Sequence, residues 1–139
     1  MNWHASDGRF MAVRLKPGAN LIEGLRNIFT ESAATAMAVV SCVGSLTQVD
    51  LRFADRPEAT RLRGRFEILS LTGTMDAAHQ HLHLSVADEH GQVRGGHLMA
   101  SGSVVYTTAE LVVAVLPGLR FARRPCALSG YDELTIAPV

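Results

Sequence analysis

Residues 20–34 read NLIEGLRNIFTESAA, and this stretch decides the fold class. Its apolar residues recur at the spacing of one face of an amphipathic helix: Leu21, Ile22, Leu25, Ile28 and Phe29. Asn20 is suited to cap the helix, because a side-chain oxygen at this position accepts hydrogen bonds from backbone N–H groups of the first turn. The pattern fades near Ala34, and the sequence holds no second pattern of this quality. We expect one main helix that lies across a sheet.

The rest of the chain predicts strands. An apolar-alternating stretch at 10–15 precedes the helix, and Lys16-Pro17-Gly18 separates the two. From residue 36 onward, short runs rich in Val, Leu, Ile and Thr are interrupted by Gly, Asp and Pro, which is typical of strands. Residues 55–60 are expected to form a loop, and Pro117-Gly118 to end a strand before the basic stretch 120–124. We expect strands near residues 37–43, 46–54, 64–71, 80–87, 92–99, 103–116 and 131–136.

These elements predict an α+β fold. A single long helix allows few strand–helix–strand crossovers, so most strands must be joined as antiparallel hairpins. The 139 residues suffice for one core, and we expect a single domain over 1–139 in which a mostly antiparallel β-sheet packs against one main α-helix. The mean hydropathy of +0.15 is high for so small a domain. Apolar surface is therefore expected to be buried between subunits.

Charge and cysteine content narrow the function classes. Thirteen Lys and Arg residues balance thirteen Asp and Glu residues, so the overall field does not attract a polyanion such as DNA. Cys42 and Cys126 are far apart and match neither a disulfide framework nor a cysteine zinc motif, which favours reduced thiols. We see no run of apolar residues long enough for a membrane span and no signal-peptide pattern. The expected location is cytoplasmic.

The chemically richest stretch is His79-Gln80-His81-Leu82-His83. Side chains alternate between the two faces of a strand, so His81 and His83 share a face. A three-residue loop at 89–91 would pair His83 with His97 on the next strand, with Cβ atoms about 4.5–5.5 Å apart. Three imidazoles around one cation leave a coordination position open for water or substrate, as in catalytic zinc sites. The neighbouring Gly95-Gly96 would let another backbone or a ligand approach closely.

Two alternatives to a metal site remain open at this point. The histidines can be the solvated side chains of an exposed edge strand, or a hairpin shifted by one residue can turn His97 to the opposite face. His79 lies at the start of the strand, whereas His4 and His90 lie in a tail and a turn. We leave these three out of the predicted site.

Two further patterns have both a functional and a structural interpretation. Glu110 lies in an otherwise apolar strand, where a buried carboxylate must be paired, ligating or protonated; an ion pair with an Arg is favoured over catalysis. Arg61, Arg63 and Arg65 share one parity and could bind phosphate groups. A solvated strand edge guarded by charge is the favoured interpretation of this row.

The hexapeptide Gly64-Arg65-Phe66-Glu67-Ile68-Leu69 resembles the signature of the plant and prokaryote conserved (PPC) domain family. Six other segments resemble that family in the same order and spacing: 14–18, 70–74, 81–83, 87–88, 95–98 and 105–110. The resemblance therefore spans nearly the whole chain. The chain looks like a stand-alone prokaryotic member. The resemblance implies an antiparallel sheet packed on a helix, a homotrimer, and zinc held by His81, His83 and His97.

The same resemblance carries two functional expectations. Plant members are nuclear proteins that bind AT-rich DNA through a separate AT-hook and use the hexapeptide region, here Gly64, Arg65, Phe66, Glu67, Ile68 and Leu69, to trimerise and to contact partners. Bacterial members are commonly described as DNA-binding by extension. Acetolactate decarboxylase shares the fold and holds catalytic zinc with a His-x-His pair and a later His, although a shared fold is a weak warrant for shared chemistry.

This chain departs from the plant pattern at the AT-hook. The motif needs Arg-Gly-Arg-Pro, and here Arg63-Gly64-Arg65 is followed by Phe66. DNA binding would then depend on arginines repeated by trimer symmetry, for which the candidates are Arg61, Arg63, Arg65, Arg120, Arg123 and Arg124.

Three functions follow as hypotheses. The leading one is a trimeric zinc-site protein that acts as a DNA-binding or transcription-associated regulator through partner contacts. The alternative is a zinc-dependent enzyme on a small carbonyl or carboxylate substrate, for which the roles of Glu67 and Glu110 stay open. A third gives the metal a structural or ligand-sensing role without turnover.

Overall fold

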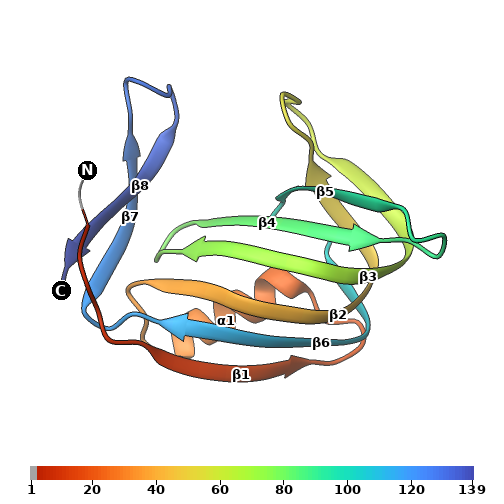
Figure 1. The fold of residues 1–139 in the computed structure, drawn as a ribbon, viewed down its shortest axis with the longest axis horizontal. Coiled ribbons are helices and arrows are strands. Elements are labelled where there is room, and N and C mark those ends of the chain that lie inside the picture. Colours follow the sequence, from red (N-terminus) through yellow and green to blue (C-terminus); the bar gives the residue numbers. More distant parts are fainter. Residues whose placement is uncertain (1–2) are drawn as a thin grey trace.

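Eight strands and one helix make up residues 3–139, the part of the chain described by this computed structural model. The elements follow in the order β1 (Arg9–Leu15), α1 (Leu21–Glu31), β2 (Met37–Arg52), β3 (Thr60–Met75), β4 (Gln80–Ala87), β5 (Val93–Leu98), β6 (Val104–Val115), β7 (Leu119–Pro125) and β8 (Asp132–Pro138). Every strand pairing is antiparallel. The predicted α+β class is confirmed (Figure 1).

The helix matches its sequence pattern. The side-chain oxygen of Asn20 accepts hydrogen bonds from the backbone N–H groups of Ile22 and Glu23, at 3.0 and 3.1 Å. All five predicted apolar positions are buried, and α1 lies across one face of the sheet (Figure 1). With 11 residues, α1 is too short to cross a membrane, and no helix in residues 3–139 is long and apolar enough to do so.

Six strands form the main sheet, in the order β1-β6-β2-β3-β4-β5. The end of β2 also pairs with β5, through Leu51 with Leu98 and Arg52 with His97, so β2 to β5 close on themselves. We predicted separate strands at 37–43 and 46–54, and this was wrong, because β2 is continuous over 16 residues. Register shifts along β2 allow the strand to bend without ending.

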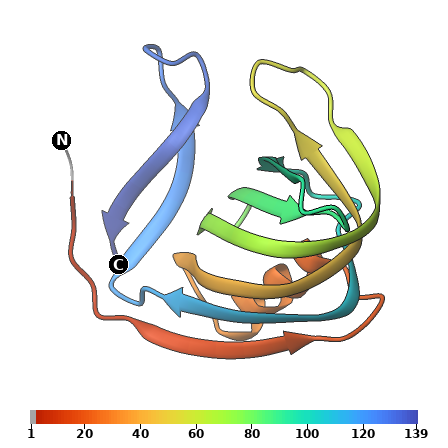
Figure 2. The ribbon, with the colours of Figure 1, turned by 45° about the vertical axis from the view of Figure 1, so that its right-hand side comes forward.

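The last two strands form a separate hairpin. β7 was missed as a strand and expected only as a basic stretch, because just two of its residues, Leu119 and Phe121, are buried. These two pack with Ala36 in a small second core, and β7 pairs with β8 in its own two-stranded sheet. In both views the hairpin stands across from the turn that joins β2 and β3 (Figures 1 and 2).

Two glycines allow the backbones of the site strands to approach closely. A Cβ atom at Gly73 would lie 1.9 Å from the carbonyl oxygen of His81, and Gly73 also has a φ of +136°. A Cβ atom at Gly96 would lie 2.7 Å from the carbonyl oxygen of Arg52. The predicted close approach at Gly96 is therefore made by the backbone of β2. Both positions hold β4 and β5 against their neighbours.

Candidate metal centre

The register of the β4–β5 hairpin brings the three predicted histidines together. The turn is closed by a hydrogen bond from the Asp88 N–H to the Gln92 carbonyl oxygen at 3.0 Å, and the Asp88 carboxylate accepts from two further backbone N–H groups of the turn. His83 consequently lies directly opposite His97, as predicted. The alternative register, shifted by one residue, is wrong.

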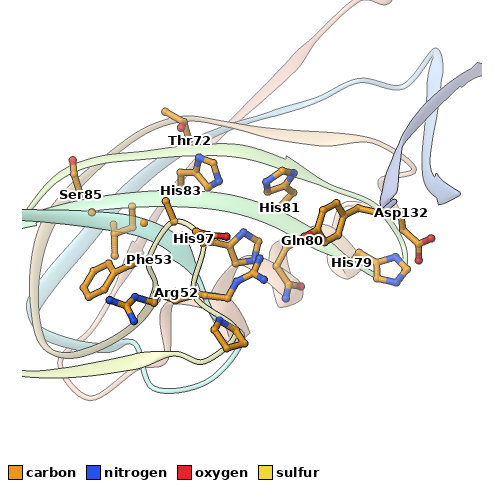
Figure 3. A pocket seen from close by; sticks show the side chains of 18 of the residues that line it. Arg52, Phe53, Thr72, His79, Gln80, His81, His83, Ser85, His97 and Asp132 are labelled. Carbon is orange, nitrogen blue, oxygen red and sulfur yellow. The ribbon is translucent and has the colours of Figure 1, made fainter. Parts of the chain in front are cut away.

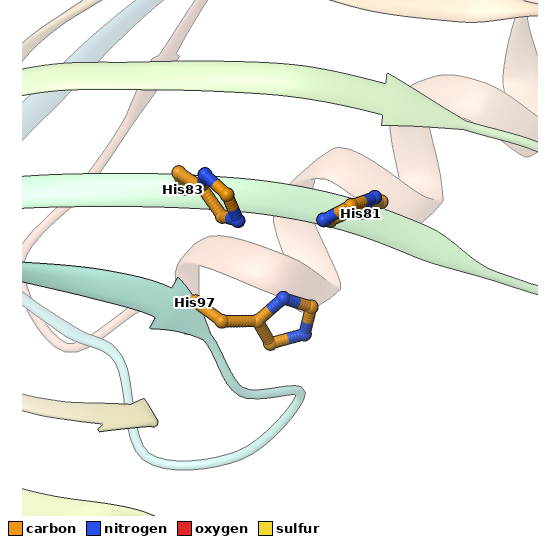
Figure 4. Close-up of side chains that lie close together, drawn as sticks. All are labelled: His81, His83 and His97. Carbon is orange, nitrogen blue, oxygen red and sulfur yellow. The ribbon is translucent and has the colours of Figure 1, made fainter. Parts of the chain in front are cut away.

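The three imidazole rings converge (Figure 4). Their centroids are 5.0 Å apart for His81 and His83, 5.3 Å for His81 and His97, and 5.9 Å for His83 and His97. One ring nitrogen of each lies within 4.8 Å of the other two. Zinc bonds of about 2.0–2.1 Å separate tetrahedral nitrogen ligands by about 3.4 Å, so modest ring rotations would complete the set. The donor chemistry fits a divalent cation that accepts imidazole.

The surroundings of the rings favour their neutral, metal-binding form. Burial lowers the pKa of His81 below 6.5, and the positive charge of Arg123 lowers it further. Burial, followed by the charge of Arg52, lowers the pKa of His97 in the same direction. Neutral imidazole has a free lone pair, so these two rings are available as ligands at neutral pH.

The cluster lies on the floor of an open cleft of about 1040 Å³ (Figure 3). One wall is the segment 52–57, which follows the end of β2. The opposite wall comes from the β7–β8 hairpin, which contributes Arg123 and residues 131–133. Thr72 and Ser85 line the floor beside the histidines. A small molecule can therefore reach the ring nitrogens from solvent.

Arg123 connects the hairpin wall to the floor. Its side chain is 10% exposed, and its Nε lies 3.9 Å from a carboxylate oxygen of Asp76. Its Nη2 donates to Thr74 Oγ1 at 3.4 Å. The other carboxylate oxygen of Asp76 accepts from the backbone N–H groups of Ala78 and His79, at 2.8 and 2.7 Å. This buried aspartate therefore joins the start of β4 to the hairpin.

Sequence reasoning missed the charged residues of the cleft. Five of them were not singled out as site residues at all: Arg52, Asp55, Arg56, Asp132 and Glu133. Arg123 was considered only for DNA, because 40 residues of chain separate it from His83. The turn after Asp76 carries a local signal, since aspartate commonly accepts from backbone N–H groups two and three residues on. No local pattern marks Arg52 or Glu133.

The histidines that the prediction left out do not join the cluster. His79 lines the cleft, but its ring pairs with the carboxylate of Asp76 at 3.3 Å. His90 lies in the exposed turn beside Glu89, and His4 lies in the N-terminal segment. The group that could hold a metal in residues 3–139 consists of His81, His83 and His97.

The prediction for Glu110 was wrong. Its side chain is exposed rather than buried, because its position on β6 faces away from the helix. Among the ion pairs within residues 3–139, none involves Glu110. Glu67 is also exposed, and neither glutamate lines the cleft.

The arginine row on β3 is partly occupied by contacts within the chain. Arg61 forms two hydrogen bonds of 2.8 Å with the buried carboxylate of Asp50. The guanidinium of Arg65 lies 4.8 Å from the ring centre of Tyr106. The row is therefore less available to phosphate groups than its spacing suggested.

The hexapeptide 64–69 is divided between the core and the surface. Phe66 and Ile68 are buried, at 8% and 5% exposure. Arg65, Glu67 and Leu69 are exposed. Of the six residues predicted to bind partners, only these three have side chains that a partner can reach on the single chain.

A family model and a protein of known sequence each match most of this chain. The family model described as the Plants and Prokaryotes Conserved (PCC) domain matches residues 4–117. The bifunctional protein GlmU of a Synechococcus strain is 46% identical over 127 residues, which are 91% of this chain. The chain spans about a fifth of the length of that relative, 20%.

Solved structures show the same fold. A hypothetical protein from Salmonella cholerae-suis is 46% identical, with a TM-score of 0.94 over 97% of each chain. A metal-containing protein from Archaeoglobus fulgidus is 24% identical, with a TM-score of 0.82 over 97% of this chain and 99% of its own. A Bacteroides thetaiotaomicron protein, for which DNA binding is itself only a proposal, is 18% identical, with a TM-score of 0.78 over 95% and 98%. The last two likenesses show the fold alone.

Proposed function

This chain belongs to the Plants and Prokaryotes Conserved domain family, and we propose that it is a divalent-metal protein of that family with one zinc site in each chain. His81, His83 and His97 would hold the ion. The observation that carries the proposal is the convergence of three ring nitrogens within 4.8 Å on the floor of an open cleft. The metal-containing protein from Archaeoglobus fulgidus, which has the same fold, supports it.

The three-histidine set suits a site that receives a ligand. A bound zinc ion supplies Lewis acidity, and three protein ligands leave coordination open on the side of the cleft. Imidazole also binds copper, nickel and iron, so the donor set selects a class of metal rather than one element. The chain's own residues hold the ion and shape the space above it.

Metal content tests the proposal. Untagged protein, purified without chelator or added metal, is expected to carry about one zinc per chain by mass spectrometry. The double variant His81→Ala/His83→Ala is expected to carry none and to keep the wild-type circular dichroism spectrum. His90→Ala, in the exposed turn, is the matched control and keeps the metal. Equal zinc in all three proteins, or none in the wild type, would overturn the proposal.

We further propose that the protein assembles as a homotrimer. Three apolar side chains on β2 and β3 are exposed: Val40 at 53%, Val43 at 65% and Leu69 at 52%. Gly44 pairs with Ile68, so Val43 and Leu69 occupy neighbouring register positions. Sedimentation equilibrium is expected to give about three times the chain mass of 15.0 kDa. Val43→Glu should give monomers, and a monomeric wild type would contradict the assembly.

A regulatory role would use partner contacts rather than DNA. The exposed charged residues of the hexapeptide, Arg65 and Glu67, are the proposed partner surface, whereas Leu69 belongs to the proposed trimer interface. DNA binding has less support, because the net charge is zero and Arg61 is held by Asp50. Both cysteines are free thiols, which supports a cytoplasmic location. We expect no binding of duplex DNA at physiological salt; tight, salt-dependent binding would restore the DNA role.

A second candidate function is a zinc-dependent enzyme on a small carbonyl or carboxylate substrate. The observation that favours it is Glu133, a half-buried carboxylate that lines the cleft and whose charge acts on His81. It supplies a proton acceptor where Glu67 and Glu110 do not. If turnover occurs, Glu133→Gln should retain zinc and lose about 100-fold or more in kcat. An unchanged kcat would exclude Glu133 from proton transfer.

A further inference from the structure

Arg52 is a cation without a carboxylate partner at the edge of the metal centre. It is half-buried at the end of β2, and it forms no ion pair within residues 3–139. Arg61, on the paired strand, differs because it is bonded twice to Asp50. A partly desolvated guanidinium presents up to five N–H donors in a planar fork that matches a carboxylate. Arg52 therefore has free binding capacity.

The position of Arg52 directs that capacity toward the histidines. Arg52 and His97 are directly paired across β2 and β5, and both line the cleft (Figure 3). Paired residues of this kind have Cβ atoms about 4.5–5.5 Å apart on one face of a sheet. The charge of Arg52 also acts on both His81 and His97. A ligand on the metal would thus lie beside the guanidinium.

Arg123 is the second cation near the triad, but its surroundings give it a different role. Its Nε faces the carboxylate of Asp76, and its Nη2 is bonded to Thr74. Its charge still acts on His81 and His97, so it adds to the positive potential of the floor. The contact of Arg123 with Asp76 links the hairpin wall to the floor, whereas Arg52 has no ion pair within residues 3–139 and stays free to bind.

We propose that the cleft takes a small α-hydroxy or α-oxo carboxylate, whose carboxylate is bound by Arg52 and whose neighbouring oxygen reaches the metal. This inference rests on the proposed metal site and names the chemical class of its ligand. An oxygen adjacent to the carboxylate is needed because Arg52 and His97 are direct neighbours across the strand pair. A short ligand is favoured because this strand pairing leaves little distance between the residue that would bind its carboxylate and a ligand of the metal.

Charge gives the preference for an anion. Three neutral imidazoles leave the charge of a divalent ion uncompensated by its ligands, and Arg52 adds a positive charge beside His97. The carboxylates that line the cleft, Asp55, Asp132 and Glu133, belong to its two walls. A neutral ligand of the same shape can still coordinate the metal, but it forms no charge-assisted pair with the guanidinium. We therefore expect Arg52 to make the cleft bind carboxylates more tightly than neutral ligands of the same shape.

Calorimetric titration of the zinc-loaded full chain tests this preference with two probes of the same shape. Glycolate carries a hydroxyl beside a carboxylate, and glycolamide replaces the carboxylate with a neutral amide. Wild-type protein should bind glycolate at least about tenfold more tightly than glycolamide. Arg52→Met should lose at least about tenfold in glycolate affinity and leave glycolamide unchanged. Arg52→Lys should restore part of the loss, because it keeps the charge without the fork.

Two controls separate this inference from the proposed metal site. Arg63→Met removes the same charge from the exposed part of β3, outside the cleft, and should bind glycolate like the wild type. Zinc content, measured on every variant, should stay at the wild-type value. Wild-type protein that fails to bind zinc would overturn the proposed metal site itself. Two results would overturn the ligand class alone. One is equal glycolate affinity of the zinc-loaded Arg52→Met and Arg63→Met variants, and the other is zinc-loaded wild-type protein that does not bind glycolate.

Discussion

The floor and the hairpin wall of the cleft are built in different ways. The floor histidines lie on β4 and β5, whose inward residues belong to the main hydrophobic core. The wall is the β7–β8 hairpin, anchored mainly by Leu119 and Phe121 against Ala36 and by the contact of Arg123 with Asp76. The family model ends at residue 117 and so includes the floor but stops before the hairpin.

This difference assigns separate tasks to the two regions. Metal ligands need fixed positions, and a sheet packed on both a helix and neighbouring strands provides them. A hairpin with a small core opens more easily, as do many elements that contact ligands. We therefore expect the floor to determine whether a metal binds, and the wall to adjust which molecules reach it.

The largest expected effect comes from breaking the floor at Gly73. In Gly73→Ala the new Cβ would meet the His81 carbonyl oxygen at 1.9 Å, at a φ of +136°. The free energy of unfolding should fall by about 4 kcal/mol or more, with loss of zinc. Urea denaturation measures this free energy of unfolding. Gly91→Ala is the control, because its φ of +74° is also positive but no atom lies within 4 Å; equal losses would refute the close approach.

Loosening the wall should have a smaller effect. Phe121→Ala removes one of the few buried anchors of the hairpin and should lower the free energy of unfolding by about 3 kcal/mol. Hydrogen exchange should accelerate in 119–138 and stay slow in β4 and β5, with zinc content unchanged. If β4 exchanges as fast as the hairpin in this variant, the two regions are one cooperative unit.

A pH-dependent effect distinguishes the sheet from the hairpin. The hydrogen bonds from Arg61 hold the pKa of Asp50 below its ordinary value of 3.8. Because the folded-state pKa is lowered, this pair stabilises the fold above about pH 3.8, and the contribution is lost as pH falls through the folded value. Arg61→Ala should lower Tm at pH 6 and have little effect at about pH 2. Arg120→Ala, on the hairpin, should show no such pH dependence.

The smallest effect is a difference in thiol reactivity that leaves the fold intact. Burial in the sheet raises the pKa of Cys42 to about 12. Backbone hydrogen bonds from Ser129 and Leu128 lower the pKa of Cys126 at the hairpin tip. A thiol reagent at pH 8 should label Cys126 quickly and Cys42 only in denaturant, since the thiolate is the reactive form. Rapid labelling of Cys42 in the native Cys126→Ser variant would show that the sheet opens.

Local patterns predicted the elements with a strong periodic signal. The helix after Asn20 and the strand at 80–87 were predicted correctly, because each buries one regular set of apolar side chains. β7 was missed because its short apolar alternation gives way to arginines. The continuity of β2 was missed because register shifts interrupt its alternation, which imitates a strand end.

The sequence by itself determined the three-histidine cluster. Strand alternation places His81 and His83 on one face, and the short turn at 88–92 sets His97 opposite His83. These relations act within about 17 residues, over which backbone geometry alone decides which side chains meet.

Only the tertiary structure decided what surrounds the cluster. Arg52 reaches His97 because β2 bends and pairs with β5, and Glu133 reaches the cleft because the hairpin stands across from the β2–β3 turn. The tertiary structure also places the side chain of Glu110 in solvent. Contacts between distant segments depend on the closure and twist of the whole sheet, which no local periodicity encodes.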